Sequence, residues 1–270
     1  MSDAPNALLQ HYLVQLIARG VTHVPLNDNA KQVLGLAGQP PQIAKARPAF
    51  AEPASGKTER LAALAVQAEK SPECRALGTL RDTMVFSTGS PNAEIMFIGE
   101  APGAEEERQR EPFVGPAGAL LTKIIQAMGF TRAGVYISNI CKFRPIVDDG
   151  RSQGSRNRPP TKPEMNACLS FIKEEIGIIQ PRVIVALGAT AAAGLGIEGS
   201  VSRIRGNFLD YNGTPILVTY HPSYLLRCEI NEDKGIKEKR LVWEDMLKVM
   251  EYLGLPISAK QRAYFSKAGA

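Results

Sequence analysis

Four side chains that could hold and read a planar ligand stand in four short segments of the sequence. Glu100 and His221 each follow an apolar run, IMFIG and ILVTY, and Asn139 ends a third run, VYISN. Phe113 lies in the segment PFVG. An amide offers a donor and an acceptor on one plane, which suits the edge of a nucleobase, and a phenyl ring offers a face for stacking. A carboxylate and an imidazole can supply acid–base groups beside such a base.

Each of these side chains also has an ordinary structural role open to it. Glu100 could be a solvated residue in the tight turn GEAPG, and Asn139 could cap the turn that follows it. Phe113 could be a core residue or a staple against the first turn of a helix. A lone histidine is most often structural. Position along the chain does not decide between these roles and a binding site.

The segment TYHPSYLLR, residues 219–227, is the most informative of the four. Pro222 fixes the backbone next to His221. Leu225 offers an apolar wedge and Arg227 a phosphate contact within the same loop. One short segment therefore combines a polar donor with groups suited to a nucleic acid.

The elements that must position these residues alternate along the chain. EIMFIGEA, VYISNIC, RVIVALG and PILVTY have the pattern of short buried strands, and helical patterns lie near residues 116–128, 162–178, 189–195 and 237–253. Alternation of this kind predicts an α/β fold, a three-layer α/β/α sandwich with a central four-stranded parallel sheet. Ligands bind beyond the carboxyl ends of such strands, which indicates the loops after Gly99, Ser138 and Thr219.

Composition bounds the setting in which the protein works. The chain of 270 residues has a net charge of +5, which is compatible with a polyanionic partner. It has no run of about 18 apolar residues, and its first residues lack the order of a signal peptide. We expect a soluble cytoplasmic protein with no membrane contact. Basic residues that could follow a phosphate backbone, or simply face solvent, are Lys142, Arg144, Arg151, Arg156, Arg158, Lys162, Arg203 and Arg205.

Taken in order, GEAPG at 99–103, PFVG at 112–115 and HPSYLLR at 221–227 resemble the uracil-DNA glycosylase superfamily, most closely its family four. The resemblance runs from about Cys74 to Tyr252. It implies a monofunctional DNA glycosylase that flips uracil out of DNA and hydrolyses its N-glycosidic bond, leaving an abasic site for base excision repair. It further implies uracil-containing DNA as the partner, and we expect a monomer.

The resemblance also assigns roles within the site. Phe113 corresponds to the ring that stacks on the flipped uracil, Asn139 to the residue that reads N3–H and O4, and His221 to the donor near O2. Ala101 stands where some relatives have a water-activating aspartate. Glu100, which precedes it, is therefore our candidate for positioning water or stabilising the cationic sugar.

The remaining assignments concern the edges of the site. Gly103 stands where other branches carry a tyrosine that excludes thymine, so Ala101 and Gly103 are expected to line the base pocket. Leu225 is the expected wedge in the duplex. The expected DNA contacts are Lys142, Arg144, Arg205, Tyr224, Leu225 and Arg227.

Iron–sulfur ligation is where the sequence departs from family four. The four cysteines are spread widely, and disulfides are not expected. The family's four cluster ligands correspond here to Ser71, Cys74, Phe143 and Cys168, so only two of the four are cysteine. Cys141 is displaced by two residues, about 6–7 Å of extended chain. We therefore expect no cluster and no metal ligands, with an apolar contact around Phe143 instead.

A second departure is the longer loop IVDDGRSQGSR at 146–156. A crosslinking relative of family four carries a histidine in a loop here, and this one has none, which disfavours covalent capture. The expected organisation is an N-terminal helix and flexible linker over 1–57, a glycosylase-like domain over 58–256 and a C-terminal tail over 257–270.

Three alternatives stay open at this level. The first is a weakly catalytic or non-catalytic protein that binds uracil or abasic sites. The second is a glycosylase for other deaminated bases such as hypoxanthine or xanthine. The third is a nucleotide-binding protein in which LGATAAAGLG cradles phosphate, although a Walker lysine and a complete GxGxxG are missing.

Overall fold

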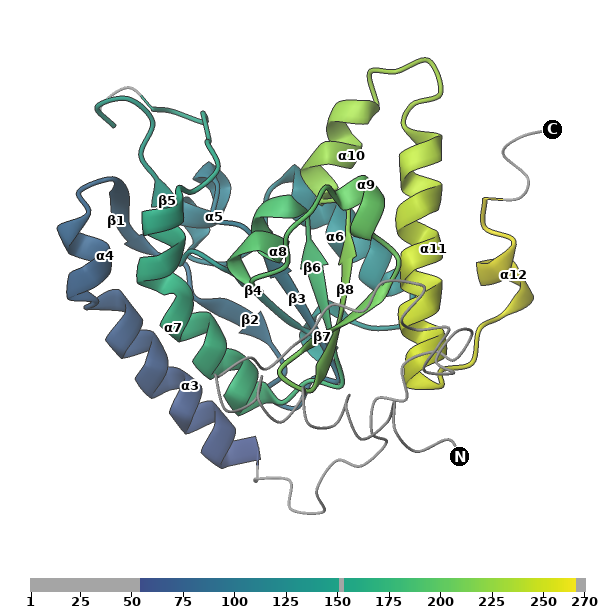
Figure 1. Ribbon diagram of the computed structural model, residues 1–270, viewed down its shortest axis with the longest axis horizontal. Coiled ribbons are helices and arrows are strands. Elements are labelled where there is room, and N and C mark those ends of the chain that lie inside the picture. The colour runs from purple at the N-terminus through teal and green to yellow at the C-terminus, as the bar shows by residue number, and fades with distance from the viewer. Residues whose placement is uncertain (1–53, 151–152, 266–270) are drawn as a thin grey trace, which may run out of the picture. The chain divides into compact units, whose positions relative to one another are not determined.

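The computed structural model describes residues 54–150 and 153–265 (Figure 1). The expected helix at 6–19 and most of the expected linker lie outside the described residues. Within them, six strands form the main sheet: β2 (Ser87–Gly89), β3 (Ile95–Gly99), β4 (Tyr136–Asn139), β6 (Val183–Leu187), β7 (Phe208–Tyr211) and β8 (Thr214–Thr219). Their order across the sheet is β2-β4-β3-β6-β8-β7.

The four central strands, β4, β3, β6 and β8, are the four expected from sequence, and they run parallel. The register pairs Gly99 with Asn139 and Leu187 with Thr219, so the carboxyl ends of these strands meet at one edge. The sheet is nevertheless mixed, because β2 and β7 add antiparallel strands at its two borders. This corrects the expectation of four strands.

Both border strands are short and only partly buried, so they lack the apolar runs that mark the central four. Asn212 and Gly213 form the turn between β7 and β8 with φ angles of 49° and 83°. An Asn-Gly pair with positive φ at both positions is the favoured two-residue hairpin turn, and it joins β7 to the sheet.

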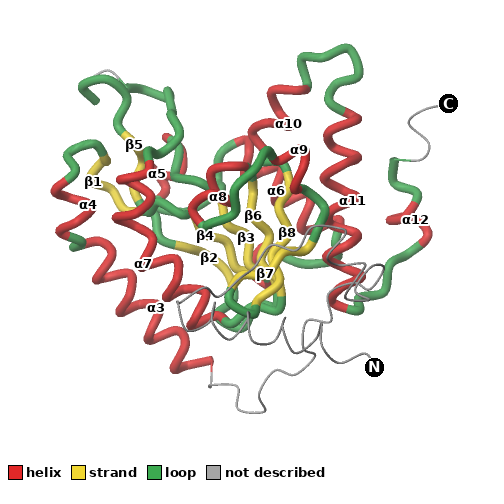
Figure 2. The backbone as a smooth tube through the Cα atoms, in the orientation of Figure 1, coloured by secondary structure: helices red, strands yellow, loops and turns green. Residues whose placement is uncertain are grey.

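Helices cover both faces of the sheet, which gives the expected three layers (Figure 2). Alternate residues of β3 point to opposite faces: Ile95 and Phe97 pack with α6 (Pro116–Ala127) and α11 (Ile236–Leu253). Met96 and Ile98 pack on the other face with α7 (Lys162–Ile179) and α8 (Ala189–Gly194). Period-two alternation between two apolar faces is what a strand buried on both sides requires.

Several shorter elements connect the main strands and helices. They are α4 (Pro72–Ala76), α5 (Ala104–Gln109), the 3-10 turn η1 (Arg132–Gly134), α9 (Val201–Ile204), α10 (Pro222–Cys228) and a two-stranded sheet of β1 (Leu80–Met84) and β5 (Phe143–Pro145). No helix among the described residues is both long and apolar enough to cross a membrane.

Packed structure extends past both expected domain boundaries. α3 (Ala54–Glu69) begins before residue 58, and its Lys57 is fully buried with Nζ donating to the carbonyl of Ile179 at 2.8 Å. At the other end, α12 (Ala259–Arg262) falls in the expected tail. The indole of Trp243 donates to the carbonyl of Gln261 at 2.8 Å, which ties this segment to α11.

Candidate active site

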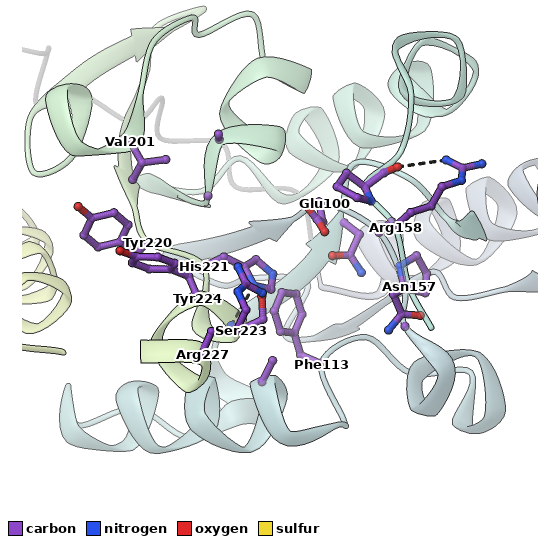
Figure 3. Close-up of a pocket in the computed structure, with 18 of the residues that line it drawn as sticks. Glu100, Phe113, Asn157, Arg158, Val201, Tyr220, His221, Ser223, Tyr224 and Arg227 are labelled. Carbon is purple, nitrogen blue, oxygen red and sulfur yellow. Dashed lines mark hydrogen bonds between the residues drawn. The ribbon is translucent and has the colours of Figure 1, made fainter. Parts of the chain in front are cut away.

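A cavity of about 690 Å³ opens at the carboxyl ends of the central strands (Figure 3). Of the twelve site residues expected from sequence, eight line it: Glu100, Ala101, Gly103, Phe113, Asn139, His221, Tyr224 and Arg227. Five of them lie at or just after the ends of β3, β4 and β8, as the rule for parallel sheets predicts. Phe113 lies between α5 and α6, and Tyr224 and Arg227 lie on α10. Four expected site residues do not line it, namely Lys142, Arg144, Arg205 and Leu225.

Asn139 ends β4 with its side chain almost fully buried, at 2% exposure. Its Oδ1 has no hydrogen-bond partner among the described residues. A buried acceptor left unpaired costs about 1–3 kcal/mol, so this oxygen is suited to a ligand that brings its own donor. A Cβ on the neighbouring Gly99 would lie 2.4 Å from Oδ1 and 2.5 Å from Cζ of Phe113, so only glycine fits between them.

The ring of Phe113 lies on the other side of Gly99 from Asn139 Oδ1, and its centroid is 5.6 Å from that of the His221 ring. The backbone φ of Phe113 is +56°, a left-handed conformation that a bulky residue rarely adopts. Gly118 permits the bend, because a Cβ there would lie 1.8 Å from the carbonyl oxygen of Phe113. A ring held in such a conformation is positioned by its surroundings and not by local preference.

Glu106, a residue that sequence reasoning did not single out, holds this loop in place. Its Oε1 accepts hydrogen bonds from the backbone N–H groups of Val114 at 3.0 Å and Gly115 at 2.9 Å. Its Oε2 accepts from Gly103 N–H at 3.1 Å. One carboxylate thus joins the GEAPG turn to the PFVG segment. The available signal was its place three residues after Gly103, the N3 position of a capping box.

His221 is the N-cap of α10, and its ring is fixed by the residue two positions along. Nδ1 accepts from the Ser223 N–H at 3.1 Å and lies 2.8 Å from Ser223 Oγ. Because a backbone N–H can only donate, Nδ1 carries no proton, and the neutral ring holds its proton on Nε2. Burial, with a smaller contribution from the positive charge of Arg227, lowers the pKa of His221 to about 4.

Glu100 follows Gly99 directly and is half-buried at the cavity wall (Figure 3). Its backbone carbonyl accepts from Cys141 N–H at 2.9 Å, which joins the loop after β3 to the loop after β4. The two loops that hold the expected acid and the expected amide are therefore tied to each other.

Lys142 and Arg144 do not reach solvent, so the structure corrects their assignment as DNA contacts. Both atoms of the Lys142–Glu175 ion pair, 2.8 Å apart, belong to fully buried side chains. Arg144 is 4% exposed and pairs with Glu107 at 2.9 Å, while its Nε donates to Asn157 Oδ1 at 2.9 Å. Cations that are buried and bound to internal acceptors are not presented to a phosphate.

Arg205 and Leu225 are also placed differently from expectation. Arg205 binds Asp245 at 2.7 Å with only 15% of its side chain exposed. Leu225, the expected wedge, lies on the inner side of α10 at 1% exposure. Tyr224 and Arg227 do line the mouth of the cavity, and their contacts with DNA stay a prediction.

The cysteines of the expected cluster region lie together as thiols. Cys74 and Cys168 have their Sγ atoms 3.5 Å apart, and Cys168 also bonds with Cys141. Phe143, at 1% exposure, packs in the same cluster, so the expected apolar contact around it is present. Cys228 is on α10, outside this group. Thiols that bond to one another through Cys168 do not fit a cubane, which needs four separated thiolates. The described residues contain no group of three or more His, Cys, Asp or Glu that could hold a metal ion.

Comparison with known proteins agrees with this geometry. A family model described as the uracil DNA glycosylase superfamily matches residues 86–247. The chain belongs to this superfamily. The Type-4 uracil-DNA glycosylase of Thermotoga maritima is 39% identical over 193 residues, covering 70% of this chain and 93% of that protein.

Further relatives of the superfamily match over shorter spans. The Type-4 uracil-DNA glycosylase of Saccharolobus solfataricus is 36% identical and covers 62% of this chain and 78% of that protein. The Type-5 uracil-DNA glycosylase of Pyrobaculum aerophilum is 31% identical over 51% of this chain and 64% of that protein. The similarity to family four inferred from the three motifs is thus confirmed.

Proposed function

We propose that this chain removes uracil from DNA by hydrolysing the bond between the base and deoxyribose. The superfamily match and the type-4 relatives support a uracil-DNA glycosylase, a DNA-repair hydrolase that acts on N-glycosyl bonds. The observation that carries the site assignment is the unpaired Oδ1 of Asn139, buried in a cavity beside the ring of Phe113. An enzyme that acts on a base must take it out of the stack into such a pocket.

Asn139 reads the base in this proposal. Its Oδ1 accepts from uracil N3–H and its Nδ2 donates to O4, while Phe113 stacks on the ring. Cytosine presents an acceptor at N3 and a donor at position 4, the reverse of uracil. Two mismatched buried polar pairs, at about 1–3 kcal/mol each, make cytosine a poor substrate.

His221 stabilises the departing base. Bond cleavage leaves negative charge on uracil, and the Nε2–H of a neutral imidazole donates toward O2 as that charge develops. The ring stays neutral at physiological pH because burial lowers its pKa to about 4. Its acceptor nitrogen is held by Ser223, so the ring cannot turn the wrong atom to the base.

Glu100 acts on the sugar side. The transition state places positive charge on deoxyribose, and a carboxylate at the loop mouth either orients the attacking water or stabilises that charge. Excision at the wild-type rate by Glu100→Gln and Glu100→Ala enzymes would remove Glu100 from the mechanism.

We further propose that the reaction proceeds without an iron–sulfur cluster. Supporting this, Phe143 replaces one ligand and the sulfurs of Cys74 and Cys168 are in contact. The test is iron and acid-labile sulfide analysis of protein purified under anaerobic conditions, together with its visible absorbance. We expect a colourless active enzyme. Stoichiometric iron and sulfide that are lost together with activity would contradict the proposal.

The partner is uracil-containing DNA, bound by one copy of the chain in the cytoplasm, where bacterial-type repair takes place. The test is a labelled oligonucleotide carrying one uracil. We expect breaks only after alkali, because a monofunctional glycosylase leaves an intact abasic strand.

In the same assay, Asn139→Ala and His221→Ala should each lower the rate of uracil excision by about 10²–10³-fold. The exposed Asn92, beyond the other end of β3, supplies the control Asn92→Ala, which should excise normally.

A further inference from the structure

A buried ammonium group lies directly beneath the base-reading part of the site. Lys142 follows Asn139 by three residues, and its side chain is fully excluded from solvent. Its Nζ contacts three acceptors: Glu175 Oε1 at 2.8 Å, Ser138 Oγ at 2.6 Å and the backbone carbonyl of Asn139 at 2.9 Å. The contacts to Ser138 and Asn139 are hydrogen bonds, whereas the contact to Glu175 is an ion pair by distance, and both carboxylate oxygens of Glu175 have no hydrogen-bond partner among the described residues.

Burial of this pair is not explained by stability. Removing a lysine and a glutamate from water carries a large desolvation cost, and well-packed apolar residues in their place often leave a protein equally stable. Two of the three contacts of Lys142 are made to Ser138 and Asn139, the last residues of β4. The ammonium therefore acts on the strand end that carries the base-reading amide.

The surrounding backbone shows what the ammonium holds. Ile140 N–H donates to the carbonyl of Gly99 at 3.0 Å, and Cys141 N–H donates to that of Glu100 at 2.9 Å. On the other side, the carbonyl of Lys142 accepts from Val85 N–H at 2.8 Å. In this turn the ammonium binds the carbonyl of Asn139. The direction of this carbonyl fixes the peptide plane next to the Cα atom that carries the Asn139 side chain.

We propose that Lys142, held by Glu175, is a positioning residue for uracil recognition. Its ammonium fixes the carbonyl of Asn139 and so aims the Asn139 amide into the cavity. Without this anchor the unpaired Oδ1 of Asn139 can turn toward another donor. This inference rests on the proposed role of Asn139.

The main test replaces the pair by apolar side chains of similar volume, in the double variant Lys142→Met/Glu175→Leu. We expect thermal stability close to that of the wild type, because no buried charge is left alone. The single-turnover rate of uracil excision should fall at least about tenfold, since small errors in position reduce rates strongly. Affinity for DNA that already holds an abasic site should stay unchanged, because such DNA has no base to read.

Lys57 supplies the matched control. It is also a fully buried lysine, but its Nζ donates to Ile179 at the end of α7 that leads into the start of β6, away from the cavity. Lys57→Met should lower stability while leaving the excision rate per folded molecule at the wild-type value. An equal fall in both enzymes would show a general effect of losing a buried lysine and overturn the proposal.

A second variant decides the matter if the double variant does not fold. Ser138→Ala removes one acceptor of the ammonium without exposing or adding a charge. We expect a fall of about threefold to tenfold in single-turnover excision with unchanged affinity for abasic DNA. A wild-type excision rate in either folded variant overturns the proposal.

Failure of the underlying role of Asn139 gives a separate result. In that case Asn139→Ala itself excises uracil at the wild-type rate in the same assay, and Lys142 has nothing to position. If Asn139→Ala is impaired and the Lys142 and Ser138 variants are not, only the positioning inference fails.

Discussion

The two walls of the cavity are built in different ways. The base-reading wall, Gly99, Phe113 and Asn139, comes from three separate segments, and its parts meet only through tertiary contacts such as those of Glu106. The leaving-group wall, His221 with Ser223, is one local segment in which a ring is fixed by the residue two positions along. Substitutions at residues outside both walls should therefore disturb base reading much more than they disturb the leaving-group contact.

The largest effect that would sharpen this contrast is expected at Glu106. Glu106→Ala leaves three backbone N–H groups without their acceptor and frees the loop that bears Phe113. Single-turnover excision should fall by about 10²-fold, because a misplacement of about 1 Å can have that effect. Glu105→Ala, one residue earlier and exposed, is the control and should keep wild-type activity. A wild-type rate for Glu106→Ala would show that Phe113 does not depend on this tie.

A pH experiment examines the leaving-group wall alone. The pKa of His221 is lowered to about 4, below its ordinary value, so between these two values the unfolded chain binds the proton and the folded chain does not. Stability should therefore fall as the pH drops from 7 to 4.5. The free energies of unfolding of wild type and His221→Asn, measured by denaturant titration, should diverge over this range by about 1–2 kcal/mol, after allowing for partial contact with solvent.

The imidazole of His221 should stay neutral over the same pH range, so its titration should not change the rate of excision there. A wild-type rate that falls with a midpoint near pH 6.5, and a variant that lacks this midpoint, would show that His221 titrates normally and that burial does not control it.

A smaller effect is expected at Ser223. Ser223→Ala removes the hydroxyl 2.8 Å from Nδ1 but keeps the backbone N–H that also binds it. The loss should be about fivefold in excision rate, the worth of one hydrogen bond of about 1 kcal/mol. Single-turnover kinetics measure it. A loss as large as that of His221→Ala would mean that the hydroxyl, and not the backbone, sets the tautomer.

The smallest effect is expected at Arg227, on the rim of the leaving-group wall. Its side chain is exposed. Loss of one phosphate contact makes the slope of log affinity for DNA against log salt concentration shallower by about one. Affinity of Arg227→Ala for abasic DNA across a salt series measures this. Arg262→Ala, on α12, is the matched control and should leave the slope unchanged. Identical slopes in all three proteins would remove Arg227 from the DNA interface.

Sequence predicted the elements whose signal is local. The four central strands have apolar runs, and their carboxyl ends brought Glu100, Asn139 and His221 to one cavity. The border strand β7 was missed because its side chains are half-exposed. A short strand of that kind is defined by its pairing with β8, which no local pattern reports.

Basic residues were the least predictable part of the site. The sequence shows that Lys142, Arg144 and Arg205 are charged, but their partners Glu175, Glu107 and Asp245 lie 33, 37 and 40 residues away along the chain. Partners at such distances come from the fold and not from spacing. Leu225 failed for a related reason, because its place on the inner face of α10 depends on where that helix packs.

The burial of all four cysteines makes this protein suited to site-specific labelling. Thiol-reactive dyes attack exposed thiolates, whereas the native thiols are buried. A hydrogen bond with Cys168 and burial raise the pKa of Cys74, and a hydrogen bond with Cys141 and burial raise the pKa of Cys168 to about 12. Ile230, 90% exposed in the loop between α10 and α11, is a natural attachment point. Ile230 follows the end of α10 whose N-cap is His221, so a dye on Ile230→Cys could report on DNA engagement at this helix without first removing any native cysteine.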